Sequence, residues 1–228
     1  MTTERPLRTV RSFVRRQGRL TLSQQNALET AWPIYGVTFS PELLNLQTLF
    51  NRDAETVLEI GFGNGDALLH MAQQHPATNF MGVEVHRPGI GHLLQYIEQN
   101  EIQNIRVFCH DAIDVLKHQI PDHSLDRLHL FFPDPWHKTR HQKRRIVQPD
   151  FALLVAQKLK PGGLFQLATD WKKYAEYMLK ILNASPVFDN LSADNTFVPR
   201  PETRPLTKFE QRGHRLGHGV WDLLYQAK

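Results

Sequence analysis

The chain has 228 residues, 41% of them hydrophobic and 22% charged, which is enough to build one α/β domain with a substantial core. Lysine and arginine outnumber aspartate and glutamate by 27 to 23, and the net charge of +4 favours an anionic partner. No stretch approaches the roughly 18 apolar residues of a membrane span, so we expect no membrane partner. The one cysteine, Cys109, cannot form an intrachain disulfide, which predicts a reducing compartment and a cytoplasmic protein.

Residues 1–20 are rich in arginine, with six arginines against one acid, Glu4. A mitochondrial transit peptide has a similar composition. The interruption at residues 17–19 and the few apolar positions argue against that alternative. We therefore predict a basic, flexible arm over residues 1–35, which orders on RNA, and one domain over residues 36–228. Within the arm, we expect residues 31–36 to form an irregular linker.

The glycine-rich stretch at residues 57–65 is the centre of the predicted domain. A short apolar run breaks into three alternating glycines, Gly61, Gly63 and Gly65, and a helical pattern follows at residues 67–72. A strand, a glycine turn and a helix form a nucleotide site in open α/β sheets, because glycine lets the backbone approach the ligand. The third glycine comes one residue too early for the dinucleotide pattern G-x-G-x-x-G. The turn instead resembles the E-x-G-x-G-x-G turn of class I methyltransferases, which bind S-adenosylmethionine.

Three acids accompany the ends of the first three predicted strands: Glu59, Glu84 and Asp111. Glu84 comes about 20 residues after Gly65, where an acid in this architecture accepts hydrogen bonds from ribose hydroxyls. Asp111 is placed to accept from the amino group of an adenine. Each acid alone could be a solvated loop residue. Together they predict an acidic rim that holds a nucleotide-like cofactor.

The hydrophobic pattern predicts alternating strands and helices. We expect strands within residues 57–60, 79–85, 105–111, 125–132 and 164–169, and helices within residues 41–50, 67–72, 93–99 and 112–120 and before Pro161. This alternation predicts a mainly parallel sheet with right-handed crossovers. Segments near Phe188 and at residues 219–224 would add two antiparallel strands.

The segment after the fourth strand carries the residues with the clearest chemical potential. Asp134 lies between Pro133 and Pro135, whose restricted backbones aim its carboxylate. Trp136 offers a face on which a base could stack. A proline-rich turn with a half-buried tryptophan is the alternative. The basic residues that follow are typical of a track for RNA phosphates; they are Lys138, Arg140, Lys143, Arg144 and Arg145.

Residues 61–65, residues 133–138 with the basic run, and residues 207–210 resemble the bacterial tRNA (guanine-N7-)-methyltransferase family. Residues 11–19 resemble the N-terminal arm of that family, so the resemblance covers nearly the whole length. It implies an α/β fold, Rossmann-like, in which a mainly parallel seven-stranded sheet has helices on both faces. It also implies methyl transfer from S-adenosyl-L-methionine to N7 of a guanosine in the tRNA variable loop, at position 46, which gives 7-methylguanosine.

The resemblance further implies a role for each site residue. The cofactor would be bound by Glu59, Glu84, Asp111 and Asp134, beside the turn of Gly61, Gly63 and Gly65. The substrate would be bound by Lys138, Asp170, Thr207, Lys208, Phe209 and Glu210, and RNA by Arg140, Lys143, Arg144 and Arg145. Guanine N7 carries a lone pair and no proton, so its methylation needs no general base. We therefore hypothesise that Asp134 is catalytic by positioning the guanine and stabilising the charge that it gains.

Three alternatives remain open at this point. An amino-group methyltransferase that acts on adenine or cytosine has a [D/N]-P-P-[Y/F/W] loop, whereas residues 133–136 contain one proline after the acid. A non-catalytic RNA-binding protein on the same scaffold is disfavoured by the intact acids. A zinc site at His137 and His141 lacks the usual further ligands, so we expect no metal. The sequence does not decide between a monomer and a homodimer.

Overall fold

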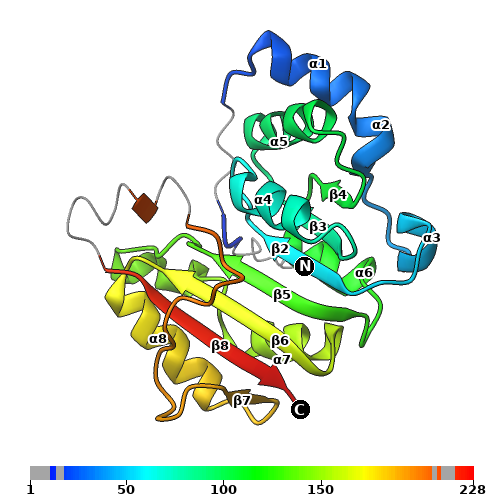
Figure 1. Cartoon of the computed structure of the whole chain (residues 1–228). Helices are drawn as coiled ribbons and strands as arrows, with labels where there is room; N and C mark the ends of the chain where they lie inside the picture. The colour runs from blue at the N-terminus through cyan, green and yellow to red at the C-terminus, as the bar shows by residue number, and fades with distance from the viewer. Residues whose placement is uncertain (1–10, 14–17, 207–209, 212–218) are drawn as a thin grey trace, which may run out of the picture.

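The computed structural model describes residues 11–13, 18–206, 210–211 and 219–228, and Figure 1 shows the arrangement of its elements. Within these residues, one sheet has eight strands in the order β1-β4-β3-β2-β5-β6-β8-β7. The strands are β1 (Gly36–Val37), β2 (Thr56–Ile60), β3 (Asn79–Val83), β4 (Ile105–Phe108), β5 (Leu125–Phe131), β6 (Leu159–Thr169), β7 (Phe188–Asn190) and β8 (Trp221–Ala227). Strands β1 to β6 are parallel, and β8 lies antiparallel between β6 and β7.

Helices cover both faces of the sheet (Figure 1). One face is covered by α1 (Leu22–Thr30), α2 (Trp32–Tyr35), α4 (Asp66–Gln74) and α5 (Arg87–Gln99). The other face is covered by α3 (Leu46–Phe50), α6 (Ala112–His118), α7 (Pro149–Lys158) and α8 (Lys172–Asn183). A short 3-10 helix, η1 (Thr139–Arg144), follows β5. No helix in the described part of the chain is long and apolar enough to cross a membrane.

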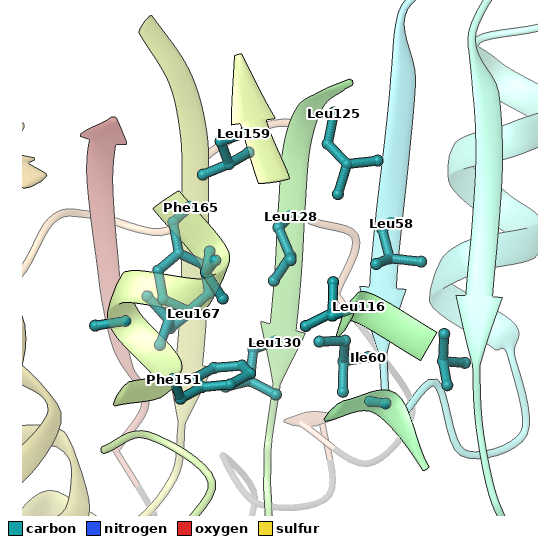
Figure 2. Close-up of a cluster of buried hydrophobic side chains, with 14 of the residues drawn as sticks. Leu58, Ile60, Leu116, Leu125, Leu128, Leu130, Phe151, Leu159, Phe165 and Leu167 are labelled. Carbon is teal, nitrogen blue, oxygen red and sulfur yellow. The ribbon is translucent and has the colours of Figure 1, made fainter. Parts of the chain in front are cut away.

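The central strands are apolar on both sides because both faces of the sheet are covered. Strand β2 is buried along its whole length. Leu58 packs toward α6 and α7, whereas its neighbour Val57 packs toward α4 and α5. Figure 2 shows that Leu128 of β5 and Phe165 of β6 continue the layer that contains Leu58. This dense packing holds the strand ends, and therefore the loops that leave them, in fixed positions.

The prediction of an irregular linker at residues 31–36 is wrong, because most of this segment is helical. Trp32–Tyr35 forms α2, and Ala31 and Tyr35 are buried in the same cluster as α5. Pro33 is compatible with this helix because the first turn needs no amide donor at that position. Helix α1, which lies against α5 (Figure 1), begins at a capping box formed by Thr21 and Gln24. We therefore restrict the proposed basic arm to residues 1–20, most of which lie outside the described residues.

Other boundaries also differ from the sequence expectations. The sheet has eight strands, whereas seven were expected. The additional strand is β1, which has only two residues, too few to produce a recognisable sequence pattern. The predicted helix at 93–99 begins earlier, at Arg87, because Pro88 fits in its first turn. Strand β6 begins at Leu159, before the predicted 164. The mainly parallel sheet and the antiparallel pair β7 and β8 are confirmed.

Candidate active site

The carboxyl ends of strands β2 to β5 meet at one edge of the sheet, because these strands are parallel neighbours. A cavity of about 230 Å³ opens at this edge. Each of the four strand ends contributes a residue to its wall: Gly61 after β2, Glu84 after β3, His110 after β4 and Asp134 after β5. Ligands of open α/β sheets bind at this edge. The cavity is therefore the candidate active site.

The glycine turn contributes Gly61 to the wall of the cavity. Gly61, Gly63 and Gly65 have φ values of 75°, 59° and 82°, in the left-handed region that glycine adopts at little cost. A Cβ added to Gly61 or Gly63 would meet no atom within 4 Å, whereas at Gly65 it would lie 2.8 Å from Leu93. The first two glycines thus leave open space for a ligand, and the third is required by packing.

Glu84 connects the end of β3 to this turn. Its Oε2 accepts a hydrogen bond from the Gly63 amide at 3.0 Å, and its Oε1 accepts from the amides of Val85 and His86 at 2.6 and 3.0 Å. Three of the roughly four acceptor positions of a carboxylate are therefore used by the backbone. The side chain is held in place at the cavity wall and retains about one position for a ligand hydroxyl.

Glu59 lies inside the sheet, and the prediction that it lies on the open rim is wrong. Its side chain is 3% exposed, and within the described part of the chain its Oε2 has no hydrogen-bond partner. Burial raises the pKa of Glu59 to about 8, and repulsion by Glu84 adds to the rise. Glu59 is therefore protonated at neutral pH. Its role as a cofactor contact stays a proposal.

Asp111 caps helix α6 and does not line the cavity. Its carboxylate accepts from the Ile113 amide at 3.1 Å, and it borders a neighbouring groove together with Lys143. The cavity wall at this strand end is formed by His110, whose ring stacks on Phe39 at 3.9 Å between centroids. The sequence analysis missed His110, although its place beside Asp111 was a usable signal. Adenine binding by Asp111 stays a proposal.

The loop after β5 contains two residues with unusual backbone conformations. Phe132 and Trp136 have φ values of 50° and 47°, which cost about 1–2 kcal/mol each for residues other than glycine. Such conformations gather at functional sites, where surrounding contacts hold them. Phe132 is held by its amide, which donates to the carbonyl of Ala168 on β6 at 2.8 Å. This loop presents the exposed Asp134 to the cavity.

Trp136 forms a hydrogen bond and contacts two neighbouring side chains. Its indole N–H donates to the carbonyl of Ser12 at 3.1 Å, and the Arg144 guanidinium lies 4.5 Å from its ring centroid. The edge of the ring meets His141, with centroids 5.9 Å apart. The ring predicted as a stacking face for a base is therefore half-buried, and Arg144 lies over it.

The basic run forms helix η1 and its two flanking residues, Lys138 and Arg145, and its members differ in burial. Arg140 and Lys143 are exposed, as a phosphate track requires. Arg145 is only 4% exposed, and its Nε donates to the carbonyl of Pro135 at 2.9 Å. Its guanidinium also packs over Tyr174 of α8 at 4.8 Å from the ring centroid. Arg145 thus fixes the loop of Asp134, and we remove it from the proposed RNA-binding residues.

Glu210 is also buried, contrary to the role of an open substrate contact. Its carboxylate receives two hydrogen bonds from Arg204, at 2.6 and 2.8 Å, and Arg204 donates two more to Asp222 of β8. The Arg204 guanidinium lies 5.7 Å from the ring centroid of Phe132. The sequence carried no signal for Arg204. The network anchors the segment at residue 210 to the sheet, beside the loop of Asp134.

The other predicted substrate residues divide between described and undescribed parts of the chain. Lys138 is exposed at the start of η1, and the half-buried Asp170 follows β6 at the same edge of the sheet. Thr207, Lys208 and Phe209 lie outside the described residues. Among the residues that the structure describes, no group of three side chains could hold a metal ion.

The comparisons with known proteins decide the family. The model of a family described as "Putative methyltransferase" matches residues 53–223. A tRNA (guanine-N(7)-)-methyltransferase of Edwardsiella ictaluri (strain 93-146) is 59% identical over 97% of this chain and 93% of its own. The enzyme of the same name from Klebsiella pneumoniae matches with the same identity and coverage.

The chain belongs to the tRNA (guanine-N7-)-methyltransferase family. The resemblance stated from the sequence is thereby confirmed. Among solved structures, the 16S rRNA methyltransferase KamB covers 80% of this chain with 92% of its own, at a TM-score of 0.60 and 14% identity. TrmN from Thermus thermophilus covers 90% of this chain with 48% of its own, at a TM-score of 0.55 and 16% identity. These likenesses confirm the Rossmann-like methyltransferase fold.

The open space above Gly63 generates a first prediction. Gly63→Ala should lower the affinity for S-adenosylmethionine roughly tenfold or more, because the new methyl group would occupy the open space in front of the turn. Gly162→Ala is the matched control. Gly162 also has a positive φ, of 81°, and a Cβ added there would lie 3.8 Å from the nearest atom, Nε2 of Gln226. Both variants should lose about 1–2 kcal/mol of stability, because alanine is strained at a positive φ. Titration calorimetry measures the affinity, and equal cofactor binding by the two variants would contradict the prediction.

The anchoring role of Glu210 generates a second prediction. Glu210→Gln leaves part of the charge of a buried arginine unpaired and should lower the free energy of unfolding by about 3–5 kcal/mol. Asp189→Asn is the control, because the Asp189–Lys228 pair is at least half exposed and should contribute under about 1 kcal/mol. Denaturant unfolding measures both. A Glu210 that served only as a substrate contact would leave the stability unchanged.

Proposed function

We propose that the protein transfers the methyl group of S-adenosylmethionine to N7 of a guanosine in the variable loop of tRNA. The curated relatives carry the name of this activity, which supports tRNA as the substrate and N7 as the acceptor. The observation that carries the proposal is the position of Asp134. Its exposed side chain stands on the wall of the cavity that Gly61 of the glycine turn also lines.

The residues around the cavity fit the cofactor. Gly61 and Gly63 leave space in front of their backbones, and Glu84 retains an acceptor position for a ribose hydroxyl. The ring of His110, fixed by its stack on Phe39, supplies a flat wall for a purine. When bound, S-adenosylmethionine supplies an electrophilic methyl group on a positively charged sulfur. The turn and the acids of the chain hold and orient it.

The acceptor atom determines what the remaining residues must do. Guanine N7 has a free lone pair on the major-groove edge of the base, so no side chain needs to remove a proton. The site must hold N7 in line with the methyl group, and such orientation can supply several kcal/mol of rate acceleration. In our proposal Asp134 accepts hydrogen bonds from the N–H groups of the guanine. Its negative charge also stabilises the positive charge that arrives on the purine.

The surroundings of the cavity supply the contacts to RNA. Lys138, in the loop of Asp134, and Asp170, in the loop after β6, would fix the target nucleotide. The exposed Arg140 and Lys143, with Arg144, would bind phosphates, each contact releasing counterions from the RNA. Methylation of an exocyclic amino group would need a loop with a second proline after the acid, and the names of the relatives do not favour it.

The identity of the product is the direct test of the function. Incubating the protein with unmodified tRNA and methyl-labelled cofactor should give labelled 7-methylguanosine after digestion to nucleosides and mass analysis. A tRNA whose variable-loop guanosine is replaced by adenosine is the control and should take up no label. Label in N6-methyladenosine would instead assign the chain to the amino-group methyltransferases.

The role of Asp134 gives a further prediction. Asp134→Asn keeps the shape of the side chain but removes its charge, so turnover should fall roughly 100-fold or more. Cofactor affinity should change far less, because the turn and Glu84 remain. Asp53→Asn, an exposed aspartate at the amino end of β2, is the control and should retain full activity. Single-turnover rates and calorimetry separate the two quantities, and equal losses in both would make Asp134 only a cofactor ligand.

A further inference from the structure

Two exposed aromatic rings meet in the loops after β5 and β6, at the edge of the sheet where the candidate site lies. The ring centroids of His137 and Trp171 lie 4.2 Å apart, and the planes are inclined by 78°, so the rings pack edge to face. Trp171 is 39% exposed and His137 is exposed. Water therefore contacts a large aromatic surface here, although burying such a surface is favourable.

The topology places this pair beside the residues proposed to bind the substrate. His137 belongs to the loop after β5 and precedes Lys138, whereas Trp171 follows β6 and Asp170. Strands β5 and β6 are parallel neighbours (Figure 1), so both loops leave the same edge of the sheet. The amide of Phe132, in the loop after β5, donates to the carbonyl of Ala168 near the end of β6. The two rings thus bridge the loop of Asp134 and the loop of Asp170.

The backbone of Trp171 is held firmly, which suits a binding surface. Its amide donates to the Thr169 hydroxyl at 3.3 Å, and its carbonyl accepts from the amide of Tyr174 in α8 at 2.8 Å. Trp136, by contrast, is engaged by Ser12 and Arg144. Of these two tryptophans beside the site, Trp171 has the more open ring.

We propose that the His137–Trp171 pair is the subsite on which the target guanine stacks. This inference rests on the proposed function. A base that is extruded from its RNA stack loses contacts with neighbouring bases, and an aromatic platform replaces them. Stacking on Trp171 would hold the guanine while Asp134 and Asp170 contact its polar edge. Lys138, adjacent to His137, would meet the sugar–phosphate of the same nucleotide.

The experiment combines variants of the protein with a variant of the RNA. Trp171→Ala should weaken tRNA binding about 5- to 150-fold, which is the usual strength of base–aromatic stacking. Trp171→Phe should recover most of this loss, whereas Trp171→Leu, which is apolar but not aromatic, should not. Tyr96→Ala is the matched control, because Tyr96 is also 39% exposed and lies 4.7 Å from a histidine, His92, on α5. Its tRNA affinity should equal that of the wild type.

The decisive arm uses a tRNA that lacks the target base but keeps its ribose and phosphate. The wild type should bind this abasic tRNA more weakly, and Trp171→Ala should then cause little further loss, because no base remains to stack. An undiminished effect of Trp171→Ala on the abasic tRNA would overturn the proposal, as would unchanged binding to intact tRNA. Thermal unfolding and cofactor affinity should match the wild type, which excludes a loss through misfolding.

Salt dependence separates stacking from phosphate binding. Trp171→Ala should lower tRNA affinity at every salt concentration without changing the slope of log affinity against log salt. Arg140→Ala should reduce that slope by about 0.7–0.9, as expected for one lost phosphate contact. A reduced slope for Trp171→Ala would contradict the stacking role.

The identity of the wild-type product is determined first. A product other than 7-methylguanosine would refute the proposed function. If the product is 7-methylguanosine but Trp171→Ala binds tRNA normally, only the stacking inference is refuted.

Discussion

The hydrogen bond from the Gly63 amide to the Glu84 carboxylate is the constraint on which the cofactor side of the site depends. It joins two segments that are 21 positions apart, the turn after β2 and the end of β3. Gly89 allows α5 to approach the same turn, since a Cβ there would lie 2.0 Å from the Gly63 carbonyl oxygen. The turn is thus fixed before a ligand arrives, which lowers the entropic cost of binding.

The substrate side is held by two buried arginines. Arg145 fastens the loop of Asp134 to α8, and Arg204 fastens the segment at Glu210 to β8. Burying a guanidinium costs free energy unless hydrogen bonds, opposite charges or aromatic contacts compensate for its lost hydration. Arg204 is compensated by Glu210 and Asp222, and Arg145 by the Pro135 carbonyl and the ring of Tyr174. The side chain of Arg140 is exposed, and its charge therefore remains available for RNA phosphates.

The same contrast applies to the two tryptophans beside the cavity. Trp136 binds the carbonyl of Ser12 and the guanidinium of Arg144, so it stabilises the loop that presents Asp134. Trp171 packs against the ring of His137 and remains 39% exposed. The loops after β5 and β6 therefore combine a stiff support with an open aromatic surface.

The amino-acid sequence by itself determined the alternating strands and helices, the glycine turn and the proline-flanked Asp134, because these are local patterns set by backbone geometry. It also determined the family, which the comparisons confirm. Only the tertiary structure decided that Arg145 and Glu210 are buried and that Trp136 is engaged. Burial and pairing depend on residues far apart in the chain, such as Ser12, which lies 124 positions from Trp136. No local sequence pattern indicates such a contact. The strand ends could therefore be predicted from the sequence, whereas the partners of their side chains could not.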